Sequence, residues 1–213
     1  MLIPKLHYIS EGNSPKEVLE NIQKACTSGI EIVQLKLDTI SEKKFLKLAN
    51  EVKEITTHFQ TRLVINKHYK IAKEIKADGV HLDKNHSCPI EARKHVYTWQ
   101  IIGGSANTLQ DCETLLKKQV DYITLSPFKN STEEENSPKA LGLNGYTLIT
   151  EALHTETPIL GFGEITTNDV SAILNTGISG IAVSEEITNN FDIIKTYNQL
   201  LKASSTEEKR HTF

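Results

Sequence analysis

Residues 63–82 read LVINKHYKIAKEIKADGVHL, and this stretch carries the pattern that decides the fold. An apolar run at 63–65 ends in the polar letters NKH at 66–68, an amphipathic segment covers 69–76, and a second apolar run follows at 80–82. Short, wholly apolar runs are typical of strands buried on both faces, as in a parallel sheet. The stretch therefore predicts a strand–helix–strand unit with two parallel strands.

The same alternation continues on both sides of this unit. Strands are expected at 6–9, 32–37, 63–65, 80–82, 101–102, 122–125, 159–162 and 181–183. Helices are expected from Ser14 to Gly29, from Ser41 onward, and over 69–76, 90–96, 109–118, 146–154, 170–176 and 193–201. Eight such units predict one (β/α)8 barrel over residues 1–203, with a polar tail over 204–213. A doubly wound open sheet is the rival, but it usually needs fewer units, and no G-x-G-x-x-G follows the first strand.

Composition excludes several classes of protein. The 213 residues hold 24 Lys and Arg against 27 Asp and Glu, for a net charge of −3, which is too balanced for a protein that neutralises nucleic-acid phosphates. No apolar run approaches the roughly 18 residues of a membrane span, and the first ten residues do not resemble a signal peptide. Cys26, Cys88 and Cys112 form no C-x-x-C motif, which argues against a zinc site or a disulfide scaffold and predicts a cytoplasmic protein.

Candidate functional residues lie where the strands end, because barrels of this kind build their sites at the carboxyl ends of the strands. Gln34 and Asn66 interrupt apolar strand ends, and a buried amide needs a protein or ligand partner. Gly163 and Ser184 follow the last two strands, where backbone N–H groups commonly hold a phosphate; tight turns are the alternative interpretation. His81 lies within a strand, where a structural role is the more common one.

Several motifs together resemble those of thiamine-phosphate synthases and their thiazole-tautomerase relatives. They are QLK at 34–36, ADGVHL at 77–82, IIGGS at 101–105, GFG at 161–163 and GIAVS at 180–184. The resemblance implies a (β/α)8 barrel that joins a hydroxymethylpyrimidine diphosphate to a hydroxyethylthiazole phosphate. It further implies passage through a pyrimidine carbocation and the use of Mg²⁺ to hold the leaving pyrophosphate.

The resemblance also assigns roles to residues of this chain. Catalytic roles fall to Lys36, Asn66 and Ser105. Gln34, Asn66 and Ser105 would hold the pyrimidine, and Lys36, with help from Lys67, would hold the diphosphate. The expected contacts of the thiazole phosphate are Ser131, Thr132, Gly163, Ser184 and Glu185. The expected partners are thus these two small phosphorylated molecules, with neither nucleic acid nor membrane, and a homodimer is compatible with the sequence.

The chain departs from the family pattern mainly in charge. Lys67 and His86 occupy the two positions of the Mg²⁺-binding carboxylates, so Mg²⁺ binding is expected to be weak or absent. Asp38 and Glu134 replace phosphate-binding lysines. An acid about 4 Å from a diphosphate charge repels it by roughly 4 kcal/mol at an effective dielectric constant of 20. Reduced turnover is therefore expected.

Two alternatives to the synthase activity remain open. One is a non-catalytic paralogue that binds the ligand or regulates through it, having kept the pocket without the chemistry. The other is a tautomerase-like enzyme, which needs neither Mg²⁺ nor a diphosphate. The catalytic histidine of that branch would follow the sixth strand, where this chain has Pro127.

Overall fold

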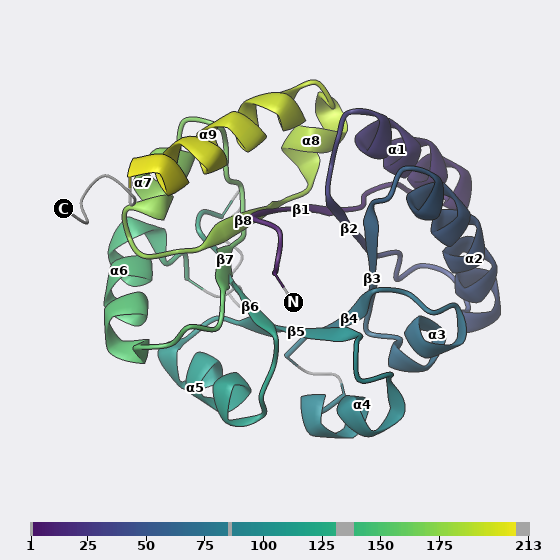
Figure 1. Cartoon of the computed structure of the whole chain (residues 1–213), viewed down its shortest axis with the longest axis horizontal. Helices are drawn as coiled ribbons and strands as arrows, with labels where there is room; N and C mark the ends of the chain where they lie inside the picture. Colours follow the sequence, from purple (N-terminus) through teal and green to yellow (C-terminus); the bar gives the residue numbers. More distant parts are fainter. Residues whose placement is uncertain (1, 85–86, 131–138, 208–213) are drawn as a thin grey trace.

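The computed structural model describes residues 2–84, 87–130 and 139–207, and its strands form one closed barrel (Figure 1). Every strand pairs in parallel with the next, and β8 pairs with β1. This arrangement confirms the (β/α)8 barrel. The strands are β1 Leu6–Ile9, β2 Ile32–Leu35, β3 Arg62–Asn66, β4 Gly79–Leu82, β5 Ile101–Ala106, β6 Tyr122–Leu125, β7 Ile159–Gly161 and β8 Gly180–Val183.

Helices form a ring outside the barrel (Figure 1). Within the described ranges, no helix is both long enough and apolar enough to cross a membrane. The helices are α1 Pro15–Thr27, α2 Glu42–His58, α3 Tyr69–Glu74, α4 Pro89–His95, α5 Leu109–Lys117, α6 Gly142–Leu153, α7 Val170–Leu174, α8 Glu185–Asn189 and α9 Ile193–Glu207.

Three helices differ from the sequence-based expectation. The short helix α8 was not expected at all, and α9 continues to Glu207 instead of ending at residue 201, so the first residues of the expected tail are helical. Helix α6 begins at Gly142 rather than at Tyr146. The backbone N–H groups of Leu141 and Gly142 donate to the carbonyls of Pro127 and Phe128, which fixes this early start on the loop after β6.

Helix starts follow the capping signals in part. Ser14 accepts a hydrogen bond from the Glu17 N–H, and Glu17 in turn accepts from the Asn13 N–H, which together satisfy two donors at the start of α1. Ser41 stands at the start of α2, as expected, but its hydroxyl makes no capping bond. Cap position is thus readable from the sequence, whereas the side-chain contact depends on the local rotamer.

Two apolar layers hold the barrel together. The larger lies between the strands and the surrounding helices, and burial of its apolar surface is the main stabilising contribution. A smaller cluster fills part of the barrel interior, and the amino-terminal segment enters the ring at its centre (Figure 1). The interior cluster consists of Ile3, Ile32, Val64, Ile101, Tyr122 and Leu160. Interior positions left to polar side chains therefore stand out as exceptions that need explaining.

Candidate active site

Two buried amides face each other from neighbouring strands. Gln34 on β2 donates through Nε2 to Oδ1 of Asn66 on β3 at 2.9 Å, and Asn66 Nδ2 donates to Oδ2 of Asp83 at 3.4 Å. Both amides are almost completely buried. Part of the partner that the sequence demanded is thus supplied within the protein. Pairing fixes the orientation of both amides, and one Nε2 hydrogen of Gln34 is left over for a ligand.

Lys67 lies between two carboxylates beside this amide pair. Its Nζ is 2.9 Å from Oδ1 of Asp38 and 3.3 Å from Oδ2 of Asp83. Lys67 has a φ of +64°, an uncommon conformation for a residue with a side chain. Partial burial alone would lower the pKa of Lys67, but the hydrogen bonds and charges of Asp38 and Asp83 raise it above its usual value. The ammonium therefore stays charged and is held in place by both acids.

These contacts change the interpretation of Asp38. The sequence indicated that Asp38 would repel a diphosphate, but its carboxylate is engaged by Lys67. The described residues do not fit a Mg²⁺ ion at this place, because an ammonium already occupies the space between the only two carboxylates of this cluster. Among the described residues, no group of three or more His, Cys, Asp or Glu could hold a metal. His86 lies outside the described residues.

A chain of polar groups runs from the barrel interior to the end of β5. His81 on β4 has Nδ1 at 3.0 Å from the Tyr122 hydroxyl and Nε2 at 2.8 Å from Oγ of Ser105. Burial lowers the pKa of His81 to about 4; Asp83 opposes this shift and the charge of Lys36 adds to it. The imidazole is therefore neutral at pH 7. The structural role expected for His81 is consistent with this burial, but the contact with Ser105 links it to the candidate site.

Lys36 lies on the loop just beyond β2. Its backbone is fixed by Ser10, whose Oγ accepts from the Lys36 N–H at 3.0 Å and donates to the Lys36 carbonyl at 3.3 Å. The side chain is exposed and forms no ion pair with any residue that the structure describes. Its charge acts on His81, so the ammonium is close enough to the mouth of the barrel to serve an anion there.

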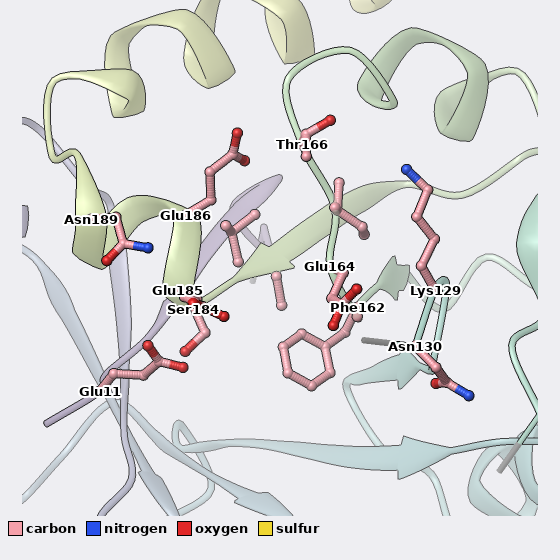
Figure 2. Close-up of a pocket in the computed structure, with 14 residues that line it drawn as sticks. Glu11, Lys129, Asn130, Phe162, Glu164, Thr166, Ser184, Glu185, Glu186 and Asn189 are labelled. Atoms are coloured by element: carbon pink, nitrogen blue, oxygen red, sulfur yellow. The ribbon is translucent and has the colours of Figure 1, made fainter. Parts of the chain in front are cut away.

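A pocket of about 500 Å³ opens between the loops after β7 and β8 (Figure 2). Gly163 has a φ of +113°, and a Cβ there would lie 2.8 Å from the Phe128 nitrogen, so glycine is required. Ser184 begins α8, but its hydroxyl donates to the Ile9 carbonyl at 2.9 Å and is therefore not free for a ligand. The backbone at Gly163 and Ser184 lies where the sequence placed the phosphate contacts.

The charge of this pocket is predominantly negative. Its lining includes Glu11, Glu164, Glu185 and Glu186 (Figure 2). The lysine of the lining, Lys129, forms an ion pair with Asp169 at 2.7 Å. The expected opposition of Glu164 and Glu185 to an anion is therefore not relieved by a free lysine in the lining. Binding of a phosphate here stays a prediction.

A second pocket of about 590 Å³ continues the first across the barrel mouth. Glu11, Phe162 and Ser184 line both pockets, and the second extends to Lys36 and Asp38 beyond β2. The space over the mouth thus connects the loops after β7 and β8 with the polar cluster at β2 and β3. Two substrates placed at its two ends could approach each other over the end of the barrel.

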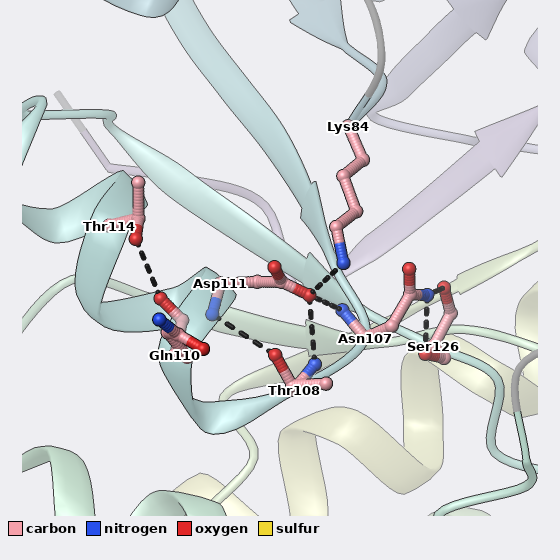
Figure 3. Close-up of polar contacts among 7 residues, drawn as sticks. All are labelled: Lys84, Asn107, Thr108, Gln110, Asp111, Thr114 and Ser126. Carbon is pink, nitrogen blue, oxygen red and sulfur yellow. Dashed lines mark hydrogen bonds and ion pairs between the residues drawn. The ribbon is translucent and has the colours of Figure 1, made fainter.

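A carboxylate frame supports the loops around Ser105 (Figure 3). Asp111 accepts hydrogen bonds from Lys84 Nζ at 2.8 Å, from the Asn107 N–H at 3.0 Å and from the Thr108 N–H at 3.1 Å. Burial opposes ionisation, but these donors hold the pKa of Asp111 below its usual value. Asn107 also donates to the Ser126 carbonyl at 2.8 Å, which connects the loops after β4, β5 and β6.

The structure brings most of the expected site residues to one end of the barrel. Gln34, Asn66 and Ser105 end neighbouring parts of the sheet, and Lys36 lies beside them. Sequence reasoning missed the contributions of Asp83 and Tyr122; the signal for both was their place on strands adjacent to the expected site. Three further residues of the expected site, Ser131, Thr132 and Glu134, lie outside the described residues.

Comparisons with known proteins all point to one family. The family model described as thiamine monophosphate synthase matches residues 6–187. A thiamine-phosphate synthase of Flavobacterium johnsoniae is 35% identical over 206 residues, covering 94% of this chain and 97% of the relative. One of Flavobacterium psychrophilum is 39% identical over 204 residues, covering 92% and 98%. The solved thiamine phosphate pyrophosphorylase of Pyrococcus furiosus has a TM-score of 0.81 at 21% identity, covers 93% of this chain and 96% of that one, and supports the fold.

Proposed function

The chain belongs to the thiamine monophosphate synthase family, and we propose that its barrel mouth joins a hydroxymethylpyrimidine diphosphate to a hydroxyethylthiazole phosphate. Membership makes it a transferase of thiamine biosynthesis. In the proposed reaction the bond between the pyrimidine methylene carbon and the diphosphate oxygen breaks, and its electron pair leaves with pyrophosphate. The thiazole ring nitrogen then supplies the electron pair for the new C–N bond. The three free cysteines fit a cytoplasmic setting.

One observation carries the assignment of the site. Gln34 and Asn66 form an oriented amide pair at the carboxyl end of the barrel, with Ser105 and Lys36 around it. Buried amides with a fixed direction suit the ring nitrogens and amino group of a pyrimidine. An exposed ammonium beside them suits the attached diphosphate. We therefore assign Gln34, Asn66 and Ser105 to the pyrimidine and Lys36 to the diphosphate.

The leaving group is held by this chain's own side chains in the proposed mechanism. Lys36 stabilises the charge that develops on the diphosphate oxygen as the C–O bond breaks. Lys67 adds a second ammonium near it, although two carboxylates share that charge. The residues around Gly163 and Ser184 are assigned to the thiazole phosphate, with Glu185 at the edge of that pocket. No step of this mechanism passes through a protein-bound metal.

A direct assay tests the proposal. The purified chain is mixed with both substrates, with and without Mg²⁺, and thiamine phosphate is measured. Lys36→Met should lower the rate at least about 10-fold, since a hydrogen bond to a charged group is worth roughly 1.5–3 kcal/mol. Lys16→Met is the matched control, because Lys16 is exposed on α1 and pairs only with Glu20. Binding of the pyrimidine diphosphate without any product under either condition would favour a non-catalytic paralogue instead.

A further inference from the structure

The hydrogen bonds of Tyr122, His81 and Ser105 form a continuous line through three neighbouring strands. Tyr122 on β6 and His81 on β4 are buried, and Ser105 on β5 is half-buried at the open end. The two bonds measure 3.0 Å and 2.8 Å. Hydrogen atoms are not visible in such a geometry, but the number of donors and acceptors along the line decides where they lie.

The direction of the first bond follows from the phenol. A tyrosine hydroxyl has one hydrogen, and His81 Nδ1 is its only hydrogen-bond partner among the residues that the structure describes. If Nδ1 carried the hydrogen and donated it, the buried phenol hydrogen would have no acceptor, at a cost of a few kcal/mol. Burial raises the pKa of Tyr122, so the hydrogen stays on the phenol. Tyr122 is therefore the donor and Nδ1 the acceptor.

The direction of the second bond follows from the first. Burial keeps the imidazole of His81 neutral, with a pKa of about 4, so the ring has a single N–H. Because Nδ1 accepts, that hydrogen lies on Nε2 and is donated to Oγ of Ser105. The hydroxyl hydrogen of Ser105 is then not used by His81. Ser105 can donate it only outward, toward the mouth of the barrel.

We infer that Tyr122 and His81 act as positioning residues whose one-way hydrogen bonds make Ser105 a hydrogen-bond donor to the diphosphate end of the substrate. This inference rests on the proposed function for the identity of the substrate, but not for the direction of the hydrogen bonds. Bonds aligned in one direction polarise each other, so the Ser105 hydroxyl becomes a stronger donor than an isolated serine. Such a donor favours an acceptor whose negative charge increases, which is the diphosphate oxygen as its bond to carbon breaks.

The first experiment needs no activity at all. Nitrogen-15 NMR of the histidine-labelled protein should show for His81 a protonated Nε2 and an unprotonated Nδ1 at pH 7. The opposite tautomer would overturn the inference whether or not the chain makes thiamine phosphate. Tyr122→Phe should broaden or shift the His81 signals, because the bond that fixes the tautomer is then missing. Unchanged signals in that variant would also overturn it.

A pair of substitutions separates positioning from packing. In His81→Gln the amide can accept from Tyr122 and donate to Ser105, so the direction is kept; in His81→Met the side chain has similar length without a donor. Inorganic pyrophosphate is the probe, with its affinity measured by calorimetry. Ser105→Ala and His81→Met should weaken binding about 10- to 100-fold, and His81→Gln should recover most of the loss.

The outcomes distinguish this inference from the proposed function. Equal affinity of His81→Met and the unmodified protein for pyrophosphate would overturn donation by Ser105. Should turnover be measurable, Ser105→Ala and His81→Met should lower kcat more than they raise KM, since the donor strengthens as charge develops. Absence of pyrophosphate binding to the unmodified protein would contradict the proposed use of this site, and with it the role of Ser105, while the NMR result would still decide the tautomer.

Discussion

Two buried histidines should make the stability of this protein depend on pH in a defined range. Burial lowers the pKa of His7 to about 3 and that of His81 to about 4, against 6.5 for an unperturbed histidine. In the unfolded chain both rings bind a proton as the pH falls below 6.5, whereas in the folded state both stay neutral. The unfolded state therefore binds more protons, and stability that is present above pH 6.5 is lost as the pH falls toward 4.

The size of the loss follows from the same values. At pH 5 each histidine contributes about 1.5 pH units of difference, or about 2 kcal/mol. Together they should lower the free energy of unfolding by about 4 kcal/mol between pH 7 and pH 5, somewhat altered by the charge interaction between His7 and His81. A loss of 4 kcal/mol is a large share of the roughly 5–15 kcal/mol typical of a domain.

Urea denaturation followed by circular dichroism at pH 7, 6 and 5 measures this loss. His7→Phe, and separately His7→Gln, should remove about 2 kcal/mol of the pH dependence, whatever either change does to stability at pH 7. His58→Gln is the control, because His58 is exposed on α2 and its replacement should leave the profile unchanged. A full 4 kcal/mol loss that persists in both His7 variants would refute the reasoning.

Two further predictions concern the barrel mouth. Lys67→Met leaves Asp38 and Asp83 without their shared cation, so calorimetry in the presence of pyrophosphate should show tighter Mg²⁺ binding than in the unmodified protein, whose affinity should be no better than millimolar; equal affinity in both would contradict the placement of the ammonium. Gly163→Ala places a Cβ 2.8 Å from the Phe128 nitrogen and should lower the free energy of unfolding by about 1–3 kcal/mol. Gly29→Ala, at φ +89° with nothing within 4 Å, is the control that reports the backbone strain alone in the same denaturation assay.

The barrel could be predicted because its strands are short apolar runs with few interruptions. Each expected strand overlaps an observed one, and differences are confined to the ends. Helix α8 was missed because five residues are too few to show a helical period. The available signal was Ser184 followed by two acidic residues, which is a common helix start.

The site was predictable by position but not by contact. The sequence placed Gln34 and Asn66 at the ends of adjacent strands, from which their pairing could have been proposed. The direction of a side chain is a different matter. Ser184 lies where a phosphate was expected, yet its hydroxyl points to the Ile9 carbonyl, a contact 175 residues away in sequence. Such a choice depends on which acceptor lies within reach after the barrel closes.

The pairing of charges determines how this site can hold a diphosphate. Lys36 and Lys67 bring two positive charges to the mouth, and Asp38 and Asp83 bring two negative charges to the same place. A Mg²⁺ ion between two carboxylates would leave the cluster neutral, whereas the single charge of Lys67 leaves its own cluster with a negative excess. The substrate therefore meets a site without net positive charge, and recognition must depend on directed hydrogen-bond donors. Oriented donors in a partly buried site are weakened by salt much less than exposed charges are. The fixed direction of the line from Tyr122 to Ser105 is then a central requirement of binding, because a hydroxyl that accepted instead of donating would add to the repulsion.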